Sequence, residues 1–164
     1  MAHDGQDVTM HTSIILDNLL ELTAAAVAPV DAVLEKAVTS VRALVSADGR
    51  VSAALIEQHQ TAAHGLAWLA TYAQALRQMQ KWAEKLSGEG RFGETEQLIH
   101  QIAFGEYLWQ IYGGIQMNQG EMLRLQDLGL SQDDMRDMMD PAIMALTQGG
   151  NTQHARTRLV ELMQ

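Results

Sequence analysis

The stretch that decides the fold is residues 52–86, SAALIEQHQTAAHGLAWLATYAQALRQMQKWAEKL. Apolar or small side chains recur in it every seven residues, in three neighbouring rows: Leu55, Ala62, Leu69, Leu76 and Ala83; Gly65, Tyr72, Met79 and Leu86; and Trp68, Ala75 and Trp82. The opposite side carries Glu57, His64, Thr71, Gln78 and Lys85. A helix with one neighbour needs a narrow apolar seam, whereas these rows cover more than half of the circumference. We therefore predict one helix, capped by Ser52, that contacts two or three partners at the centre of a bundle.

A long helix is also predicted before this stretch, from Ser13 to Val45, because apolar residues follow one another there mostly in steps of three and four. Pro29 lies inside it, and a proline within a helix removes one backbone hydrogen bond and clashes with the preceding turn. We expect a kink or a break near Ala28. A turn at residues 47–50 should join the two helices.

A third helix is predicted to have Glu94 and Glu96 in its first turn, where carboxylates oppose the positive end of the helix dipole. Gly113 and Gly114 should end or break this helix. Asn118, with Glu121 three residues later, resembles a capping box, so we expect helix to restart there.

The remainder of the chain is typical of a smaller helical tail. Ser131 can cap a methionine-rich segment. Asp140 and Pro141 match an N-cap followed by proline at the first helical position. Asn151 is expected to cap the last helix.

Composition supports an all-α fold of ordinary domain size. The chain has 164 residues, of which 47% are apolar and 5% aromatic, with two prolines and no cysteine. We predict an antiparallel helical bundle, divided into a disordered leader (1–12), a bundle (13–130), and a helical tail or linker to a following domain (131–164). The lack of cysteine excludes disulfides, thiolate metal sites and thiol nucleophiles.

The charge of the chain argues against two classes of partner. The net charge is −9, and no cluster of lysine and arginine offsets it, so nucleic acid and anionic lipid should repel the chain. No run reaches the about eighteen apolar residues of a membrane span. We expect no nucleic-acid partner, no membrane partner and a cytoplasmic location.

The sequence predicts no self-sufficient active site, and therefore no catalytic residue. His59 and His64 are five residues apart, which does not place two metal ligands on one helix face, so no metal site is expected. Glu106 shares a helix face with Gln110 and is either an acid–base group or a hydrogen-bonded carboxylate at the edge of the bundle. The glycines of residues 88–93 favour a hinge between helices over a phosphate-binding loop.

Aromatic and methionine side chains leave two interpretations open. Trp68, Tyr72, Trp82, Trp109 and Tyr112 either pack in the core or anchor a partner, because tryptophan and tyrosine dominate interface hot spots. Met135, Met138 and Met139 either fill a loosely packed core or form an adaptable contact surface.

The segment Gln110-Ile111-Tyr112-Gly113-Gly114 resembles the Q-x-x-G-G motif in the helical C-terminal domain of acyl-CoA dehydrogenases. Longer stretches extend the resemblance: AHGLAWLATY at 63–72, GEGRFGETE at 88–96, GEYL at 105–108, GGI at 113–115 and QGE at 119–121. Together they are similar to the N-terminal extension of the methylsuccinyl-CoA dehydrogenases, a branch of that family in the ethylmalonyl-CoA route. The resemblance covers roughly residues 51–130.

The resemblance implies an FAD enzyme as the parent and makes Gln110, Gly113 and Gly114 the candidate cofactor-binding residues. The family motif continues with a glycine and an aromatic, where this chain has Gln116 and Met117. A side chain in place of glycine blocks close backbone approach to a ring or phosphate. The N-terminal helical and middle β-domains of the family cannot be fitted into the chain, so no cofactor is expected in this chain alone.

Three hypotheses follow. The first is an accessory, non-catalytic helical domain that packs against the catalytic part of an acyl-CoA dehydrogenase or associates with itself. The second is an oxidoreductase subunit that binds flavin or acyl-CoA around residues 110–114. The third is an unrelated helical adaptor whose tail binds the partner.

Overall fold

The computed structural model describes residues 13–164, and the predicted leader at residues 1–12 lies outside the described residues. The helices are α1 (Leu19–Leu44), α2 (Ala53–Gln58), α3 (Gln60–Gly88), α4 (Glu94–Gly113), α5 (Pro141–Gly149) and α6 (Gln153–Leu162), with 3-10 helices η1 (Leu125–Leu128) and η2 (Asp134–Met139). The strands form two antiparallel pairs, β1 (Ser46–Ala47) with β2 (Arg50–Val51) and β3 (Ile115–Gln116) with β4 (Met122–Leu123). The predicted all-α helical bundle is confirmed.

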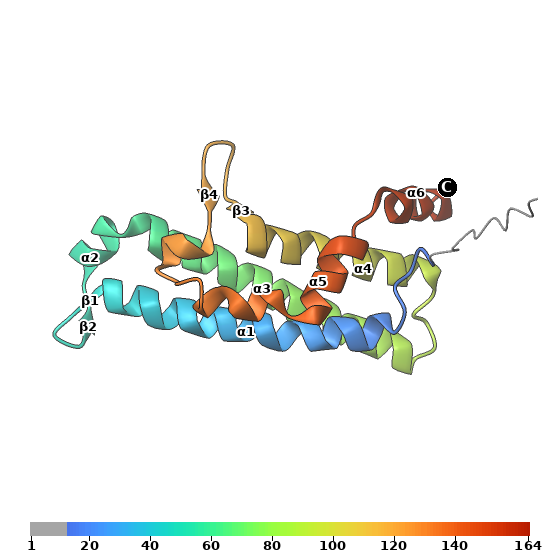
Figure 1. Cartoon of the computed structure of the whole chain (residues 1–164), viewed down its shortest axis with the longest axis horizontal. Coiled ribbons are helices and arrows are strands. Elements are labelled where there is room, and N and C mark those ends of the chain that lie inside the picture. The colour runs from blue at the N-terminus through green and yellow to red at the C-terminus, as the bar shows by residue number, and fades with distance from the viewer. Residues whose placement is uncertain (1–12) are drawn as a thin grey trace, which may run out of the picture.

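An elongated body of α1, α3 and α4 organises the bundle (Figure 1). The β1–β2 hairpin and α2 reverse the chain between α1 and α3, so these two helices run antiparallel. η2 and α5 pack along α1, and α6 packs on α4. The β3–β4 hairpin projects from the body at the end of α4 (Figure 1).

The seven-residue rows of α3 explain its central place. Ala62, Leu69 and Leu76 are fully or almost fully buried, and α3 contacts α1, α4 and η1. The polar side that the sequence predicts, from His64 to Lys85, is exposed throughout. The prediction of a central helix with several neighbours is therefore confirmed.

The predicted first helix, 13–45, is wrong at its start, and the break expected near Ala28 is absent, whereas a kink there stays a prediction. The helix begins at Leu19, after Asn18 adopts a left-handed conformation with φ +50°. Helix α1 continues through Pro29 without the expected break. Ala25, whose carbonyl loses its backbone donor to the proline ring, is exposed, so that carbonyl can accept from water instead.

The helix predicted for 52–86 is interrupted at His59, where φ −112° and ψ +36° leave the helical region. Ser52 does cap α2, as predicted, because its hydroxyl accepts from the Leu55 amide. The Ser52 amide also donates to the Val45 carbonyl at 2.9 Å. This bond ties α2 to the end of α1, so the chain bends at His59 before α3 can run back along α1.

The helix expected to restart at Asn118 is also wrong, because a hairpin occupies this position. The Asn118 side-chain oxygen accepts from the amides of Gly120 (2.8 Å) and Glu121 (3.0 Å). The Met117 amide donates to the Glu121 carbonyl across the hairpin. An Asn–x–x–Glu pattern is compatible with a turn as well as with the start of a helix. Here the pairing of β3 with β4 selects the turn.

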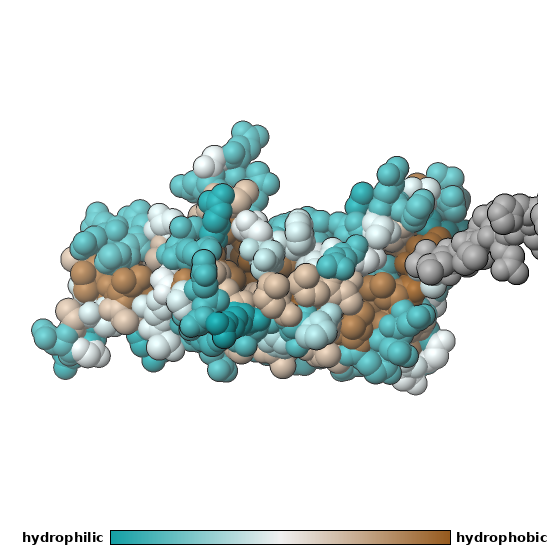
Figure 2. Space-filling model, viewed as in Figure 1, coloured by the Kyte–Doolittle hydropathy of each residue, from teal (hydrophilic) through white to brown (hydrophobic). Residues whose placement is uncertain are grey.

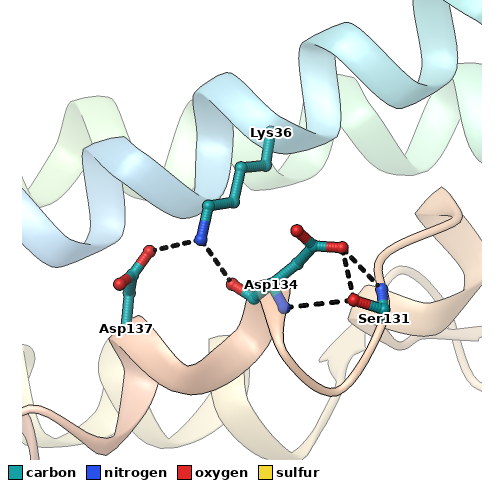
Figure 3. A network of polar contacts seen from close by, with 4 residues as sticks. All are labelled: Lys36, Ser131, Asp134 and Asp137. Carbon is teal, nitrogen blue, oxygen red and sulfur yellow. Dashed lines mark hydrogen bonds and ion pairs between the residues drawn. The ribbon is translucent and has the colours of Figure 1, made fainter.

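Residues 131–164 share the core of the bundle. Met138, Ile143 and Leu146 are buried in the same cluster as the side chains of α1 and α3. Lys36 of α1 donates to the Asp137 carboxylate at 2.7 Å and to the Asp134 carbonyl at 3.1 Å (Figure 3). The division of the chain at residue 130 stays a prediction.

Of the three caps predicted for the last part of the chain, Asp140 is confirmed, whereas Asp133 and not Ser131 occupies the N-cap position of η2. Ser131 accepts from the Asp134 amide, although the element that follows is η2, a 3-10 helix. Asp140 caps α5 and is followed by Pro141, as predicted. The last prediction is wrong: Thr152 caps α6, while the Asn151 side-chain oxygen accepts from Arg156 and its side-chain NH₂ donates to Glu106.

Close backbone contact at Gly105 joins α4 to the α5–α6 connection. A Cβ at Gly105 would lie 2.7 Å from the Asn151 amide nitrogen and 2.9 Å from the Leu146 carbonyl oxygen. Both are backbone atoms, which cannot move aside as a flexible side chain can.

We expect Gly105→Ala to lower the free energy of unfolding by about 1–3 kcal/mol, as overpacking of a core does. Gly88→Ala is the matched control, because a Cβ at Gly88 would contact nothing within 4 Å and alanine favours helix. Urea unfolding followed by circular dichroism measures both. Equal stabilities of the two variants would contradict the close contact.

Candidate functional site

Gln110 lies near the C-terminal end of α4 with its carboxamide turned toward α3. The Tyr72 hydroxyl donates to its Oε1 at 2.5 Å, and its Nε2 donates to Glu106 Oε1 at 2.6 Å. The contact with Tyr72 ties α3 to α4. The carboxamide is therefore engaged on both sides within the bundle.

Glu106 connects this pair to α6. Its second oxygen accepts from the Asn151 side-chain amide at 2.6 Å, and Arg156 donates to Asn151 Oδ1 at 2.7 Å. The carboxylate is half-buried, and each of its oxygens accepts from an amide donor. Of the two interpretations of Glu106, the structure therefore has the hydrogen-bonded carboxylate.

Tyr72 is held as a neutral donor in this network. Burial raises the pKa of its hydroxyl, and the neighbouring Tyr107 and Glu106 raise it further. The rings of Tyr72 and Tyr107 lie edge to face with centroids 4.7 Å apart. At neutral pH the Tyr72 hydroxyl keeps its proton and its bond to Gln110.

Gly113 and Gly114 play different parts at the end of α4. Gly113 is exposed, and a Cβ there would meet nothing within 4 Å. Gly114 has φ +136°, which favours glycine, and a Cβ there would lie 2.5 Å from the Met122 sulfur. The Met122 side chain thus lies against Gly114, where it limits the close approach of another group to this backbone. A flavin contact at Gln110, Gly113 and Gly114 stays a prediction.

The five aromatic side chains divide by exposure. Trp68 and Tyr72 are half-buried, and the Trp68 indole donates to His64 Nε2 at 2.9 Å. Trp82 is 37% exposed, Tyr112 49% and Trp109 56%. Core packing therefore does not account for Trp109 and Tyr112, whose ring centroids are 6.0 Å apart.

The described residues, 13–164, also bear on the predictions about metal and membrane. Within this range no three histidine, aspartate or glutamate residues come close enough together to hold a metal ion. His64 is exposed and His59 half-buried at the bend between α2 and α3. None of the helices in the described range has the length and apolar character that crossing a membrane requires.

A buried polar cluster around His100 escaped the sequence analysis, because its partners Thr23 and Gln80 lie on other helices, far away in the sequence. His100 is fully buried, and its Nε2 lies 2.9 Å from the Thr23 hydroxyl. Thr23 in turn lies 2.7 Å from Gln80 Oε1. His100 Nδ1 has no hydrogen-bond partner. We therefore assign the imidazole proton to Nε2, because an unpaired buried N–H is rarer than an unpaired acceptor.

Burial lowers the pKa of His100 from its usual 6.5 to about 4. In the unfolded chain, His100 takes up a proton as the pH falls below its usual pKa of 6.5. In the folded chain it stays neutral until the pH reaches about 4. The contribution of His100 to the stability of the folded chain is therefore complete above pH 6.5 and is lost as the pH falls from 6.5 to about 4.

We expect acidification from pH 7 to pH 4 to lower the free energy of unfolding through His100 by up to about 3 kcal/mol. His100→Gln keeps a donor for Thr23 but has no charged form, so its stability should fall less over the same range. His64→Gln, at an exposed position, should behave like the parent chain. Urea titrations at several pH values test this, and identical pH dependence in all three proteins would contradict it.

Comparison with known proteins shows that the chain is similar in sequence to part of a larger enzyme. No model of a known protein family matches it. It is 50% identical over 149 residues to a (2S)-methylsuccinyl-CoA dehydrogenase of Cereibacter sphaeroides. The match covers 91% of this chain and 26% of that enzyme, so the chain spans about a quarter of its relative. That the matched stretch is an N-terminal extension stays a prediction. The chain is thus similar to one part of a methylsuccinyl-CoA dehydrogenase, which confirms the resemblance that its sequence predicts.

Proposed function

We propose that this chain is an accessory, non-catalytic helical domain of an acyl-CoA dehydrogenase-like flavoenzyme of the methylsuccinyl-CoA type. Its role is to pack against the catalytic part or to associate with itself. The observation that carries the proposal is the 50% identity over 91% of this chain, within 26% of a larger dehydrogenase. A match of this extent aligns almost the whole described bundle with one part of the enzyme.

The geometry around residues 110–114 supports packing over catalysis. Both oxygens of Glu106 accept from amides of the same chain, and Gln110 is bound to Tyr72. These groups stabilise the bundle instead of facing a substrate. In this proposal FAD belongs to the catalytic part, and the proposal includes a cytoplasmic location and a role in the ethylmalonyl-CoA route.

The direct test is co-expression with the Cereibacter sphaeroides dehydrogenase from which the matched stretch has been deleted. We expect an equimolar complex that carries flavin, measured by light scattering after size exclusion and by visible absorption. The same chain co-expressed with an unrelated flavoprotein is the control. A strictly monomeric chain with no affinity for the dehydrogenase would overturn the proposal.

The second candidate function is a flavin- or acyl-CoA-binding subunit built around Gln110, Gly113 and Gly114. The open space at Gly113 is the observation in its favour. The engaged carboxamide of Gln110 and the Met122 side chain count against it.

After incubation with FAD and desalting, we expect the isolated chain to be colourless. A retained flavin band would favour the second candidate, provided that Gln110→Ala removes the band. Gln78→Ala, on the exposed side of α3, is the control for a non-specific effect of losing a glutamine.

A further inference from the structure

Helix α6 is attached to the bundle in a different way from its neighbour α5. The part of residues 131–164 that shares the core consists of η2 and α5, through Met138, Ile143 and Leu146. Among the described side chains of α6, Ala155 is the buried one, and it lies outside that core cluster. Val160 is 55% exposed, and Figure 2 shows a mainly hydrophilic surface over α6. Apolar packing therefore contributes less to the attachment of α6 than to that of α5.

An ion pair with two hydrogen bonds fastens the middle of α6 to the start of α4. Arg158 Nε donates to Glu94 Oε1 at 2.7 Å, and its Nη2 donates to Glu94 Oε2 at 3.0 Å. The two residues are 64 positions apart, so the pair joins two elements instead of supporting one helix. Both side chains reach solvent, with 36% and 45% of their surface exposed. Such a pair has a defined geometry, but salt in the solvent screens it.

A second attachment lies where the chain enters α6. The Asn151 side chain donates to Glu106 at 2.6 Å. The Gly150 backbone packs against Gly105, and its carbonyl accepts from the buried Gln101 side chain at 3.2 Å. This connection is thus fixed to α4, and once the ion pair breaks α6 can turn away about it while α5 keeps its place.

The face of α4 that α6 covers carries an apolar side chain. Glu94, Leu98 and Gly105 lie on one face of α4, because spacings of four and seven residues return to the same side of a helix. Glu94 binds Arg158 of α6, and Gly105 contacts the backbone that leads into α6. Leu98, between these two contacts, is fully buried, yet it does not belong to the core cluster of the described residues. Helix α6 therefore covers Leu98.

We propose that α6 is an ionic latch, which opens as a unit when the Glu94–Arg158 pair is broken or screened and then uncovers Leu98 while α1, α3 and α5 stay folded. Segments with few buried apolar contacts open at a lower free energy than the whole protein does. High ionic strength favours the open latch, because it weakens the ion pair and leaves the apolar core in place. The latch is a property of this chain by itself and does not depend on the partner in the proposed function.

The chain has no cysteine, so a single introduced thiol can report on the opening. Leu98→Cys places the thiol under α6. Leu69→Cys is the matched control, because Leu69 is equally buried but lies in the seam between α1 and α3. Below the unfolding transition, we expect a maleimide to label Leu98→Cys at least about tenfold faster than Leu69→Cys, since local opening costs less free energy than global unfolding. Labelling of Leu98→Cys should quicken as sodium chloride rises from about 0.02 M to about 1 M, and labelling of Leu69→Cys should not.

Glu94→Gln removes the ion pair and keeps the size of the side chain. Added to Leu98→Cys, it should raise the labelling rate about two- to fivefold at low salt, as loss of an exposed ion pair does, and remove most of the response to salt. Glu89→Gln is the control, because it breaks an exposed pair with Arg91 that lies outside α6. It should leave the labelling rate unchanged.

Amide hydrogen exchange of the parent chain measures the same opening without a substitution in a buried position. Below the unfolding transition, the exchange of α6 amides should depend only weakly on urea, whereas that of α3 amides should rise steeply, because local opening exposes little surface. Equal urea dependence in α6 and α3 would overturn the latch. So would equal labelling of the two thiols, or an effect of Glu94→Gln no larger than that of Glu89→Gln.

Discussion

The rest of the structure depends on the seam between α1 and α3. Small and β-branched side chains of α1, such as Ala26, Val33 and Ala37, are completely buried, and so is Leu69 of α3. Complete burial of a side chain of the size of leucine contributes about 1.5–3 kcal/mol, so a seam of such residues outweighs the single helix bond that Pro29 removes. α4 and η1 then cover other sides of α3.

Polar groups inside the bundle select one arrangement of these helices. Thr23 of α1, Gln80 of α3 and His100 of α4 meet in one buried cluster, which requires all three helices to be in register. Gln101 adds a second constraint, because its carboxamide binds the Leu16 amide and the Gly150 carbonyl. A shift of any helix would leave a buried polar group without its partner, at a cost of about 1–3 kcal/mol.

The end of α4 combines an internally bonded side with an outward apolar side. Glu106 and Gln110 bind neighbouring elements, whereas Trp109 and Tyr112 face away from the core. This division places the motif that resembles a flavin-side segment within the packing of the bundle. The proposals for function follow from this division and from the similarity to one part of a dehydrogenase.

The sequence by itself determined the helical class, the central place of the stretch 52–86 although not its interruption at His59, the caps at Ser52 and Asp140, and the end or break of α4 at Gly113 and Gly114. These features depend on periodicity and on bonds between near neighbours in the chain, which a local pattern records. Only the tertiary structure decided that His100 is buried, that Asn118 turns a hairpin, that Asn151 binds Glu106, and that Trp109 and Tyr112 are exposed. Each of these depends on groups distant in sequence or on where neighbouring elements end, and the same local pattern is compatible with more than one outcome.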